Sequence, residues 1–177
     1  MPTPERTSLA AIVDAGRALL ELGGPSHVTM QAVAVRVGVR APSLYKRVRD
    51  RDALLRLVAE ATVDELGERL AASDGSLSGL ARAYRSFAHD RPEGFRLMYG
   101  VAGSPDALQR ASEPVLRAAR DAVGSDRALD AARLLTAWAT GFVNMELAGA
   151  FRLGGDVDEA FEYGLERLAA ALEPTPR

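Results

Sequence analysis

The sequence of 177 residues predicts an all-α protein of about nine helices. Apolar residues recur at three- and four-residue spacing along most of the chain, as they do on one face of an α-helix. No alternating run of β-branched and polar residues reaches the length of a strand. A small polar stretch, AASDGS at residues 71–76, is the expected domain boundary. We therefore expect an N-terminal domain over residues 1–50, a connecting helix over 51–70 and a second helical domain over 71–177.

The first two expected helices are separated by a glycine-rich stop. The first lies in SLAAIVDAGRALLELGG and ends at Gly23, Gly24 and Pro25. Thr29 suits the N-cap of the second helix, MQAVAVRV, because its hydroxyl can accept a hydrogen bond from an unpaired backbone N–H. Gly38 is expected to end that helix.

The next two helices complete a recognisable motif. The third is PSLYKRV at residues 42–48, and Pro42 suits its first position, where the missing N–H would be unpaired in any case. Asp50 is expected to cap a fourth helix over residues 51–70. Two short helices joined by a turn that contains glycine, with one helix before and one after, form a helix-turn-helix.

Five further helices are expected in the C-terminal part of the chain. The last two are long and amphipathic, and two such helices from each of two subunits can form a four-helix dimer interface. The alternative is that they form the internal core of one subunit. The five expected helices lie near residues 77–90, 92–101, 105–123 (with a break at Pro114 as one reading), 127–152 and 157–172, and the candidate interface residues are Leu147, Phe151, Phe161, Leu165 and Leu168.

Composition narrows the function classes. The absence of cysteine excludes disulfides and thiolate chemistry. No apolar run approaches the ~18 residues of a membrane helix, and the N-terminal MPTPERTS has no signal-peptide core, so we expect a cytoplasmic protein without membrane contact. His27 and His89 lack metal-ligand spacing, and no phosphate-binding loop or Ser–His–acid set stands out. We therefore expect no metal, no cofactor and no enzymatic activity.

Charge is concentrated in one segment. Residues 36–56 contain seven basic residues and two aspartates, a net charge of +5, whereas the whole chain carries −2. A basic patch on an acidic protein suggests an anionic partner at one site. The alternatives are a solvated arginine-rich face on a helical enzyme, or on an adaptor that binds only protein; neither would bind duplex DNA in a salt-dependent way.

The side chains around the third expected helix suit DNA binding, because the second helix of a helix-turn-helix lies in the major groove. Tyr45 can give its hydroxyl to a phosphate, although a half-buried structural aromatic is the alternative. Lys46 and Arg47 carry donors for phosphate or for guanine O6 and N7. Arg51 is expected to contact a phosphate, because it lies near the start of the fourth expected helix, at the positive end of the helix dipole. The candidate DNA-binding residues are Thr29, Gln31, Arg40, Ala41, Pro42, Ser43, Tyr45, Lys46, Arg47 and Arg51.

The segment VTMQAVAVRVGVRAPSLYKRVRDRDALLRLV resembles the helix-turn-helix of the TetR (tetracycline repressor) family of bacterial transcription regulators. Lys46 follows the tyrosine where the family often has His or Trp, and Val48 replaces the more usual Phe. The resemblance implies a repressor that binds a palindromic double-stranded DNA operator as a homodimer, with activation as the alternative. The residues that match the family pattern are Thr29, Gly38, Val39, Ser43, Leu44, Tyr45, Val48, Arg51, Ala53, Leu54 and Leu55.

Two C-terminal segments, DRPEGFRLMYG and GFVNMELAGAF, resemble the ligand-binding domain of a TetR subgroup with a Trp…His-Gly signature. Thr140 stands before Gly141 in place of the histidine, and Thr136 stands in place of the tryptophan, with Trp138 nearby. The resemblance implies that the C-terminal part senses a small molecule.

Large apolar residues in the 77–145 region are the candidate effector pocket, since such residues around few polar groups are the usual lining of a small-molecule site. The alternative is that they fill a core. Asn144 offers a polar group, and no cluster of charge accompanies the set, which indicates a small hydrophobic effector that releases the protein from DNA. The candidate residues are Tyr84, Phe87, Phe95, Met98, Tyr99, Trp138, Phe142 and Met145.

Overall fold

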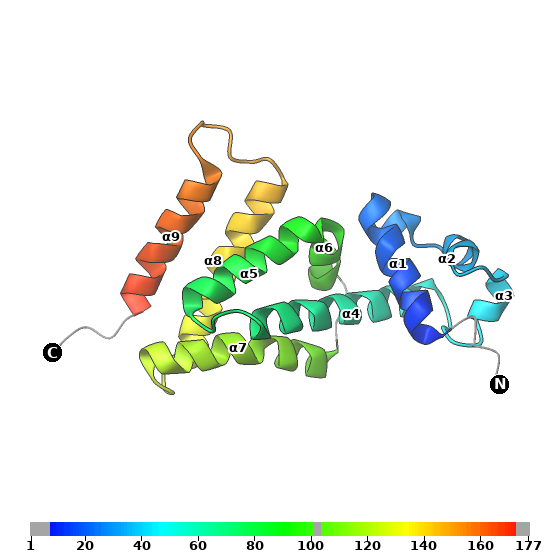
Figure 1. The fold of residues 1–177 in the computed structure, drawn as a ribbon, viewed down its shortest axis with the longest axis horizontal. Helices are drawn as coiled ribbons and strands as arrows, with labels where there is room; N and C mark the ends of the chain where they lie inside the picture. Colours follow the sequence, from blue (N-terminus) through cyan, green and yellow to red (C-terminus); the bar gives the residue numbers. More distant parts are fainter. Residues whose placement is uncertain (1–7, 101–103, 173–177) are drawn as a thin grey trace. The chain divides into compact units, whose positions relative to one another are not determined.

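The computed structural model describes residues 8–100 and 104–172, and in these ranges the chain is helical with no strand, which confirms the all-α prediction. None of the helices in these ranges is both long and apolar enough to cross a bilayer. The helices, labelled in Figure 1, are α1 (Leu9–Gly23), the 3-10 helix η1 (Pro25–His27), α2 (Met30–Arg36), α3 (Ala41–Leu44), α4 (Arg51–Ala71), α5 (Leu77–Asp90), α6 (Pro92–Gly100), α7 (Pro105–Val123), α8 (Ala128–Leu147) and α9 (Val157–Leu172).

The chain divides into two compact units. The first unit comprises Met1–Glu65 and Arg91–Leu108, and the second comprises Leu66–Asp90 and Gln109–Arg177. The division falls inside α4. Helix α6 belongs to the first unit by its contacts, although the sequence suggested a boundary at residues 71–76 that would place it with the C-terminal helices.

Side-chain caps begin the helices of the first unit where the sequence predicts them. The hydroxyl of Thr29 accepts a hydrogen bond from the N–H of Ala32 at 3.1 Å, at the start of α2. Asp50 accepts from the N–H of Ala53 at 2.7 Å, at the start of α4. Gly38 follows α2 with a φ of 72°, a left-handed conformation that favours glycine. The turn between the two short helices therefore depends on this residue.

Helix α3 is shorter than the predicted 42–48. It begins at Ala41, so Pro42 is its second residue and not its first, and its α-helical part ends at Leu44. The chain continues as a tight turn, in which Arg47 and Val48 both donate their N–H groups to the carbonyl of Leu44, at 2.8 and 2.9 Å. Neither of the first two helical positions requires an N–H, so proline is accommodated at either.

The ends of two C-terminal helices also differ from the expected ones. Helix α8 stops at Leu147 instead of near residue 152, because Gly149 adopts a φ of 62° and closes the helix. The N–H of Gly149 bonds to Glu146 and that of Ala150 to Met145, both at 2.9 Å, which is the Schellman arrangement. Helix α7 runs through Pro114 without ending there. Residue 101, at the end of the helix expected over 92–101, lies outside the described residues.

The core of the first unit joins α1, α2, α3 and α4. Its fully buried side chains include Ile12, Val33, Leu44 and Val58. Helix α6 also contributes to this core through Leu97. The carboxylate of Glu21 in α1 accepts hydrogen bonds from the N–H groups of Glu93 and Gly94 at 3.2 and 2.9 Å, which caps the first turn of α6. The helix-turn-helix and α6 are therefore held together by packing and by a charged cap.

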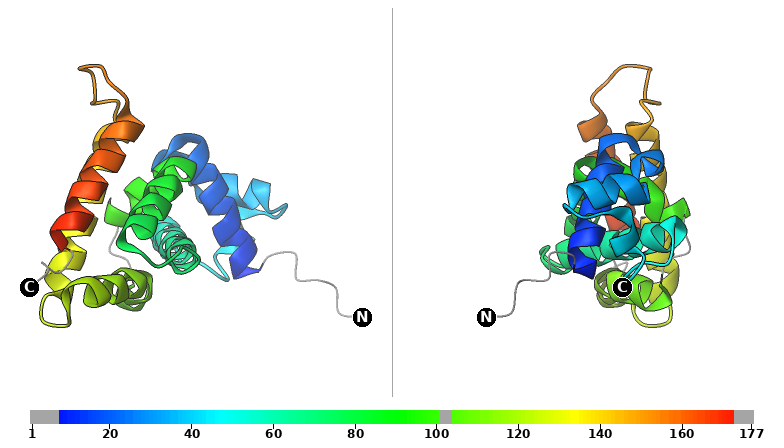
Figure 2. Two further views of the ribbon diagram at one scale, coloured as in Figure 1. Left: turned by 60° about the vertical axis from the view of Figure 1, so that its left-hand side comes forward. Right: turned by 90° about the vertical axis from the view of Figure 1, so that its right-hand side faces the viewer.

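The second unit is built on α5, α8 and α9, each of which contacts the other two. Figure 2 shows α8 and α9 side by side, connected by the loop of residues 148–156. The ring of Phe161 lies 5.1 Å from that of Trp138 and 5.3 Å from that of Phe142, measured between centroids. Gly164 faces the tryptophan, and a Cβ atom at this position would lie only 2.6 Å from Cζ2 of Trp138. Aromatic packing against a glycine thus fixes the approach of α9 to α8.

Candidate nucleic-acid interface

The segment made of α3 and the turn that follows it, residues 41–48, has one buried and one exposed side. Leu44 is fully buried and Val48 nearly so, and both belong to the core of the first unit. Tyr45, between them, is 54% exposed and does not belong to that core. Figure 1 shows α2 and α3 as successive short helices beside α1. The burial of Leu44 and Val48 therefore fixes which side chains of this segment face outward.

Most of the candidate DNA-binding side chains lie on the surface. The exposed ones are Thr29, Gln31, Arg40, Pro42, Tyr45, Lys46 and Arg47, and the partly buried ones are Ala41, Ser43 and Arg51. Two further exposed side chains near them, Val35 and Arg36, were not among the candidates. The structure thus brings hydroxyl groups, a phenol and several cations to the outer side of one short motif.

The carboxylate of Asp50 is used within its own segment and is not directed at the exposed cations nearby. Its carboxylate is used to cap α4 and is also paired with Arg49, with Nε and Oδ2 2.6 Å apart. The hydrogen bond from the Ala53 backbone lowers the pKa of Asp50, and the hydrogen bond from Arg49 lowers it further. The aspartate is therefore ionised and directed at the start of α4. The side chains of Arg40 and Lys46 remain exposed to solvent.

Arg51 is placed differently from the other candidates. Its Nε–H donates to the carbonyl oxygen of Val28 at 2.8 Å, and its Nη2 donates to that of Pro25 at 2.5 Å. The sequence could not show these contacts, because the acceptors are backbone atoms of a turn that lies far from Arg51 in the chain. The proposed contact of Arg51 with phosphate remains a prediction that competes with this intramolecular role.

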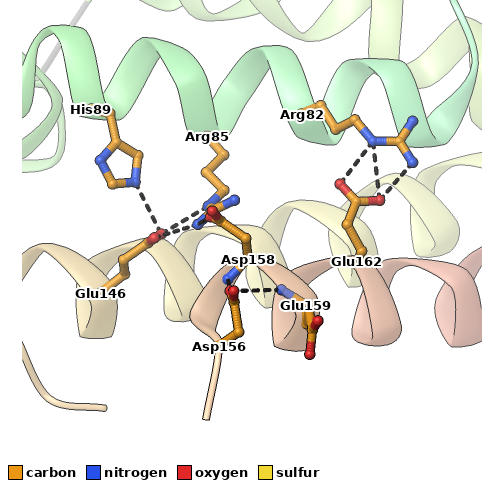
Figure 3. Close-up of polar contacts among 8 residues, drawn as sticks. All are labelled: Arg82, Arg85, His89, Glu146, Asp156, Asp158, Glu159 and Glu162. Atoms are coloured by element: carbon orange, nitrogen blue, oxygen red, sulfur yellow. Dashed lines mark hydrogen bonds and ion pairs between the residues drawn. The ribbon is translucent and has the colours of Figure 1, made fainter. Parts of the chain in front are cut away.

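The second unit contains a line of ion pairs that the sequence analysis did not identify. Arg82, Arg85 and His89 lie on one side of α5 and face carboxylates of α8 and α9 (Figure 3). Arg85 forms a fork with Glu146 and also reaches Asp158 at 2.5 Å. The only sign in the sequence was the spacing of the three basic residues, which puts them on one helix face.

His89 has a carboxylate partner that lies far from it in the sequence. Its Nε2 lies 3.1 Å from Oε2 of Glu146, on α8. Arg82 pairs with Glu162, its Nη2 lying 2.6 Å from Oε2. A cleft of about 300 Å³ runs along these residues and reaches Ser86 and Phe161. Among the described residues, no group of three or more His, Asp or Glu side chains could hold a metal ion.

The ion pairs shift the protonation equilibria of their members. The hydrogen bonds from Arg85 lower the pKa of Glu146, and the contact with His89 lowers it further, although burial opposes both. The carboxylate of Glu146 raises the pKa of Arg85 in turn. The two side chains are only 12% and 16% exposed, whereas that of Asp158 is 81% exposed. The Arg85–Glu146 pair is therefore the protected centre of the line and Asp158 its exposed edge.

The predicted effector residues come from both units. In the second unit, Tyr84 and Phe87 are buried on α5, and the hydroxyl oxygen of Tyr84 lies 2.8 Å from that of Thr140, a polar pair that the sequence analysis missed. Trp138 and Phe142 pack against each other, with their ring centroids 5.8 Å apart. Met145 of the second unit is exposed; Phe95, Met98 and Tyr99 belong to the first unit.

The predicted dimer residues divide into surface and core. Phe161 is 0% and Leu165 1% exposed, so these two are core residues of the second unit and not surface residues, because α9 packs this side against α5 and α8. Phe151 is partly covered by Phe142, at 4.8 Å between ring centroids. Leu147 and Leu168 are partly buried. The exposed large apolar side chains of the two helices are instead Leu129, Leu134, Met145 and Tyr163.

A helix-turn-helix with outward basic side chains, joined to a second helical unit, defines a DNA-binding transcriptional regulator. The family described as bacterial regulatory proteins, tetR family, matches residues 12–58, and the tetracyclin repressor-like C-terminal domain matches residues 77–168. An uncharacterized HTH-type transcriptional regulator of Mycobacterium tuberculosis is 30% identical over 188 residues, which cover 96% of this chain and 84% of the relative. The chain belongs to the TetR family.

Solved structures share this fold over nearly the whole chain. A TetR variant from Acinetobacter baumannii in complex with minocycline is 25% identical, with a TM-score of 0.70, and the match covers 93% of this chain and 96% of that one. A protein of unknown function from Rhodococcus sp. RHA1 has a TM-score of 0.80 at 22% identity, with 98% of this chain and 100% of that chain covered.

Proposed function

We propose that this regulator binds a palindromic operator as a homodimer in the bacterial cytoplasm, represses transcription, and leaves the operator when a small hydrophobic effector binds. The observation that carries the proposal is the division of one segment, α3 and the turn that follows it up to Val48, into a buried and an exposed side. Leu44 and Val48 are buried, while Tyr45, Lys46 and Arg47 face outward. A short helix anchored in this way can enter the major groove and present these three side chains to DNA.

The outward side chains have distinct expected roles. The hydroxyls of Thr29 and Ser43 and the phenol of Tyr45 suit phosphate oxygens, which fix the position of the helix on the duplex. Lys46 suits guanine O6 and N7, which would carry sequence preference. One short helix contacts few base pairs, so two copies related by a two-fold axis, about 34–36 Å apart, are needed for a selective site.

The test is DNA affinity measured over a range of salt concentrations. Arg47→Ala should weaken binding to specific and random duplexes alike, and should lower the slope of log K against log salt by about 0.9 if the side chain neutralises one phosphate. Lys46→Ala should relax preference at one base pair, at a cost of about 1–3 kcal/mol. Arg127→Ala removes an exposed arginine in the second unit and serves as the control. Equal salt slopes in all of these proteins would refute the placement of α3.

The dimer is proposed to form through the exposed apolar side chains of α8 and α9. Leu134, Met145 and Tyr163 are large, apolar and exposed on these helices, and a four-helix interface would cover them. Leu134→Glu with Tyr163→Glu should give a monomer by sedimentation, still helical but unable to bind the operator tightly. Leu22→Glu, at an exposed position of α1, is the matched control. A doubly substituted protein that remains dimeric would place the interface elsewhere.

The effector is proposed to be small, hydrophobic and weakly polar. The buried Tyr84–Thr140 hydroxyl pair, beside the buried ring of Phe87, offers orienting polar groups within apolar surroundings, as small-molecule sites do. A TetR variant from Acinetobacter baumannii that shares this fold was solved with minocycline, a precedent for ligand binding in the family.

The effector test combines two measurements. Apolar compounds are titrated while the fluorescence of Trp138, the single tryptophan, and the release of operator DNA are followed together. A true effector should weaken DNA binding by about 1–3 kcal/mol, and DNA should weaken effector binding equally. A Tyr84→Phe, Thr140→Val protein, which lacks the hydroxyl pair within the second unit, should lose the response. Undiminished release in that protein would show that the pocket lies elsewhere.

A further inference from the structure

We infer that Arg51 is a positioning residue of the helix-turn-helix, which holds the segment before α2 in place and does not neutralise a phosphate. The guanidinium donates from Nε to the carbonyl of Val28 and from Nη2 to that of Pro25. The two acceptors frame the turn that leads into α2. We refer to Arg51 with these two carbonyls as the Arg51 brace.

The brace supplies donors to the short helix η1 at Pro25 and to Val28, the irregular residue that follows it. Val28 follows η1 with a φ of −82° and a ψ of 86°, and this valine is fully buried. A carbonyl in buried, irregular backbone needs a hydrogen-bond donor, because burial without one is costly. The Nε–H of Arg51 is the donor that reaches it, at 2.8 Å. The charge of the guanidinium strengthens both bonds.

The segment held by the brace sets the position of Thr29. Thr29 directly follows Val28, and its own N–H bonds to the carbonyl of His27 at 3.0 Å. Its hydroxyl caps α2 through the N–H of Ala32. Helix α2 in turn contacts α3, and Tyr45 and Lys46 follow directly after α3. Movement of this turn would therefore shift the cap and the two DNA-facing helices together.

The geometry requires arginine and not merely a cation. The guanidinium of Arg51 meets the two carbonyls with two different nitrogen atoms, Nε and Nη2, which are held in one plane. The three donors of lysine share one nitrogen atom, which would have to lie within hydrogen-bond distance of both oxygens at once. The group is also turned toward the protein by these bonds, and the residue is only partly exposed. A phosphate contact through Nε and Nη2 would need these two donors to face outward.

The inference rests on the proposed DNA binding for one of its two tests. In the first, the affinities of wild-type, Arg51→Ala, Arg51→Lys and Arg47→Ala proteins are measured for two probes over a range of salt concentrations. The probes are a duplex selected on the wild-type protein from a random library and a scrambled duplex of the same composition. The fraction of binding-competent protein is determined for each variant by titration, so that partial unfolding is not read as weaker affinity.

Both Arg51 variants should lose about tenfold in affinity for the selected duplex, the scale of one lost base-pair contact, and much less for the scrambled one. Their salt slopes should stay at the wild-type value. Arg47→Ala should behave oppositely, with the ratio of the two affinities kept and the slope lowered by about 0.9. A lowered slope with an unchanged ratio in Arg51→Ala, or wild-type behaviour in Arg51→Lys, would overturn the inference.

The second test needs no DNA. In the free wild-type protein, the Nε–H proton of Arg51 should exchange with water more slowly than that of Arg40, an exposed arginine of the same motif. Equal exchange rates would overturn the brace even if the protein binds DNA well. A wild-type protein that does not distinguish the two duplexes would instead refute the proposed function, and slow exchange at Arg51 would still support the brace.

Discussion

One exposed arginine of the first unit and two paired arginines of the second unit are placed in opposite ways. In the first unit, Arg40 stands exposed in a segment with seven basic residues and two aspartates, and one of these, Asp50, is used to cap a helix. In the second unit, Arg82 and Arg85 each face a carboxylate from another helix. At these three positions, the carboxylates that face the arginine decide whether it holds helices together or is left exposed for binding.

The largest expected effect tests the packing beneath the ion pairs. Phe161→Ala should cost about 3–5 kcal/mol of unfolding free energy, because the fully buried ring contacts Trp138 and Phe142, and the guanidinium of Arg85 lies over it at 4.7 Å. Urea unfolding followed by Trp138 fluorescence measures this loss. Leu153→Ala, in the exposed loop before α9, should change it by less than about 0.5 kcal/mol. Similar losses in both variants would mean that this core is not packed as described.

The next effect tests the protected ion pair. Glu146→Gln should destabilise the second unit by about 1.5–3 kcal/mol, because Arg85 loses a charged fork and keeps only the exposed Asp158. Urea unfolding at neutral pH measures the loss. The comparison between the units would fail if this variant were as stable as the wild type.

The same pair predicts how stability depends on pH. Because Arg85 lowers the pKa of Glu146 in the folded state below its usual value of about 4.5, the pair stabilises the fold fully above that value. The contribution is lost as the pH falls through the lowered pKa. Unfolding free energies from about pH 7 to pH 3 should therefore fall more steeply for the wild type than for Glu146→Gln. Parallel curves would contradict the assignment.

A smaller effect is expected in the first unit. Thr29→Ala should cost about 0.5–2 kcal/mol, because the N-cap bond to Ala32 is lost, and Thr29→Ser should restore most of it. Circular dichroism during urea unfolding follows the helices of both units, whereas Trp138 reports on the second. A loss seen equally by both signals would show that the two units unfold together.

The smallest effect separates exposed from protected ion pairs. Glu162→Gln should cost only about 0.2–1 kcal/mol, since the pair with Arg82 is open to solvent. This loss should shrink further in high salt, because salt screens exposed charges. A loss as large as that of Glu146→Gln would indicate that exposure does not govern these pairs.

The sequence predicts local features well. The caps at Thr29 and Asp50 were predicted from residue type and confirmed in the structure, because a cap depends on atoms within three residues. The α-helical content and the helix-turn-helix were predicted for the same reason. The end of α8 was missed by several residues, since the Gly149 stop competes with an apolar run that continues to Phe151.

Contacts between distant segments could not be predicted in this way. The pairs of Arg85 with Glu146 and of Tyr84 with Thr140 join α5 to α8, and neither residue type nor spacing specifies such a pair. The burial of Phe161 has the same origin, because an amphipathic helix shows which side is apolar but not whether that side meets its own chain or another copy. The assignment of Arg51 to phosphate failed to anticipate two backbone acceptors.

Gly164 limits which substitutions α9 can accept during evolution. A single nucleotide change in a glycine codon that is not synonymous introduces a Cβ atom or a stop codon, and a Cβ here would meet Cζ2 of Trp138 at 2.6 Å. The ring has little freedom to retreat, because it is stacked on Phe161 at an interplanar angle of 27°. A residue larger than glycine at position 164 should therefore be tolerated only after Trp138 has been replaced by a smaller residue. In a saturation library screened for repression, tolerated residues at 164 should be found together with substitutions at 138, and the order of the two changes should decide which lineages survive.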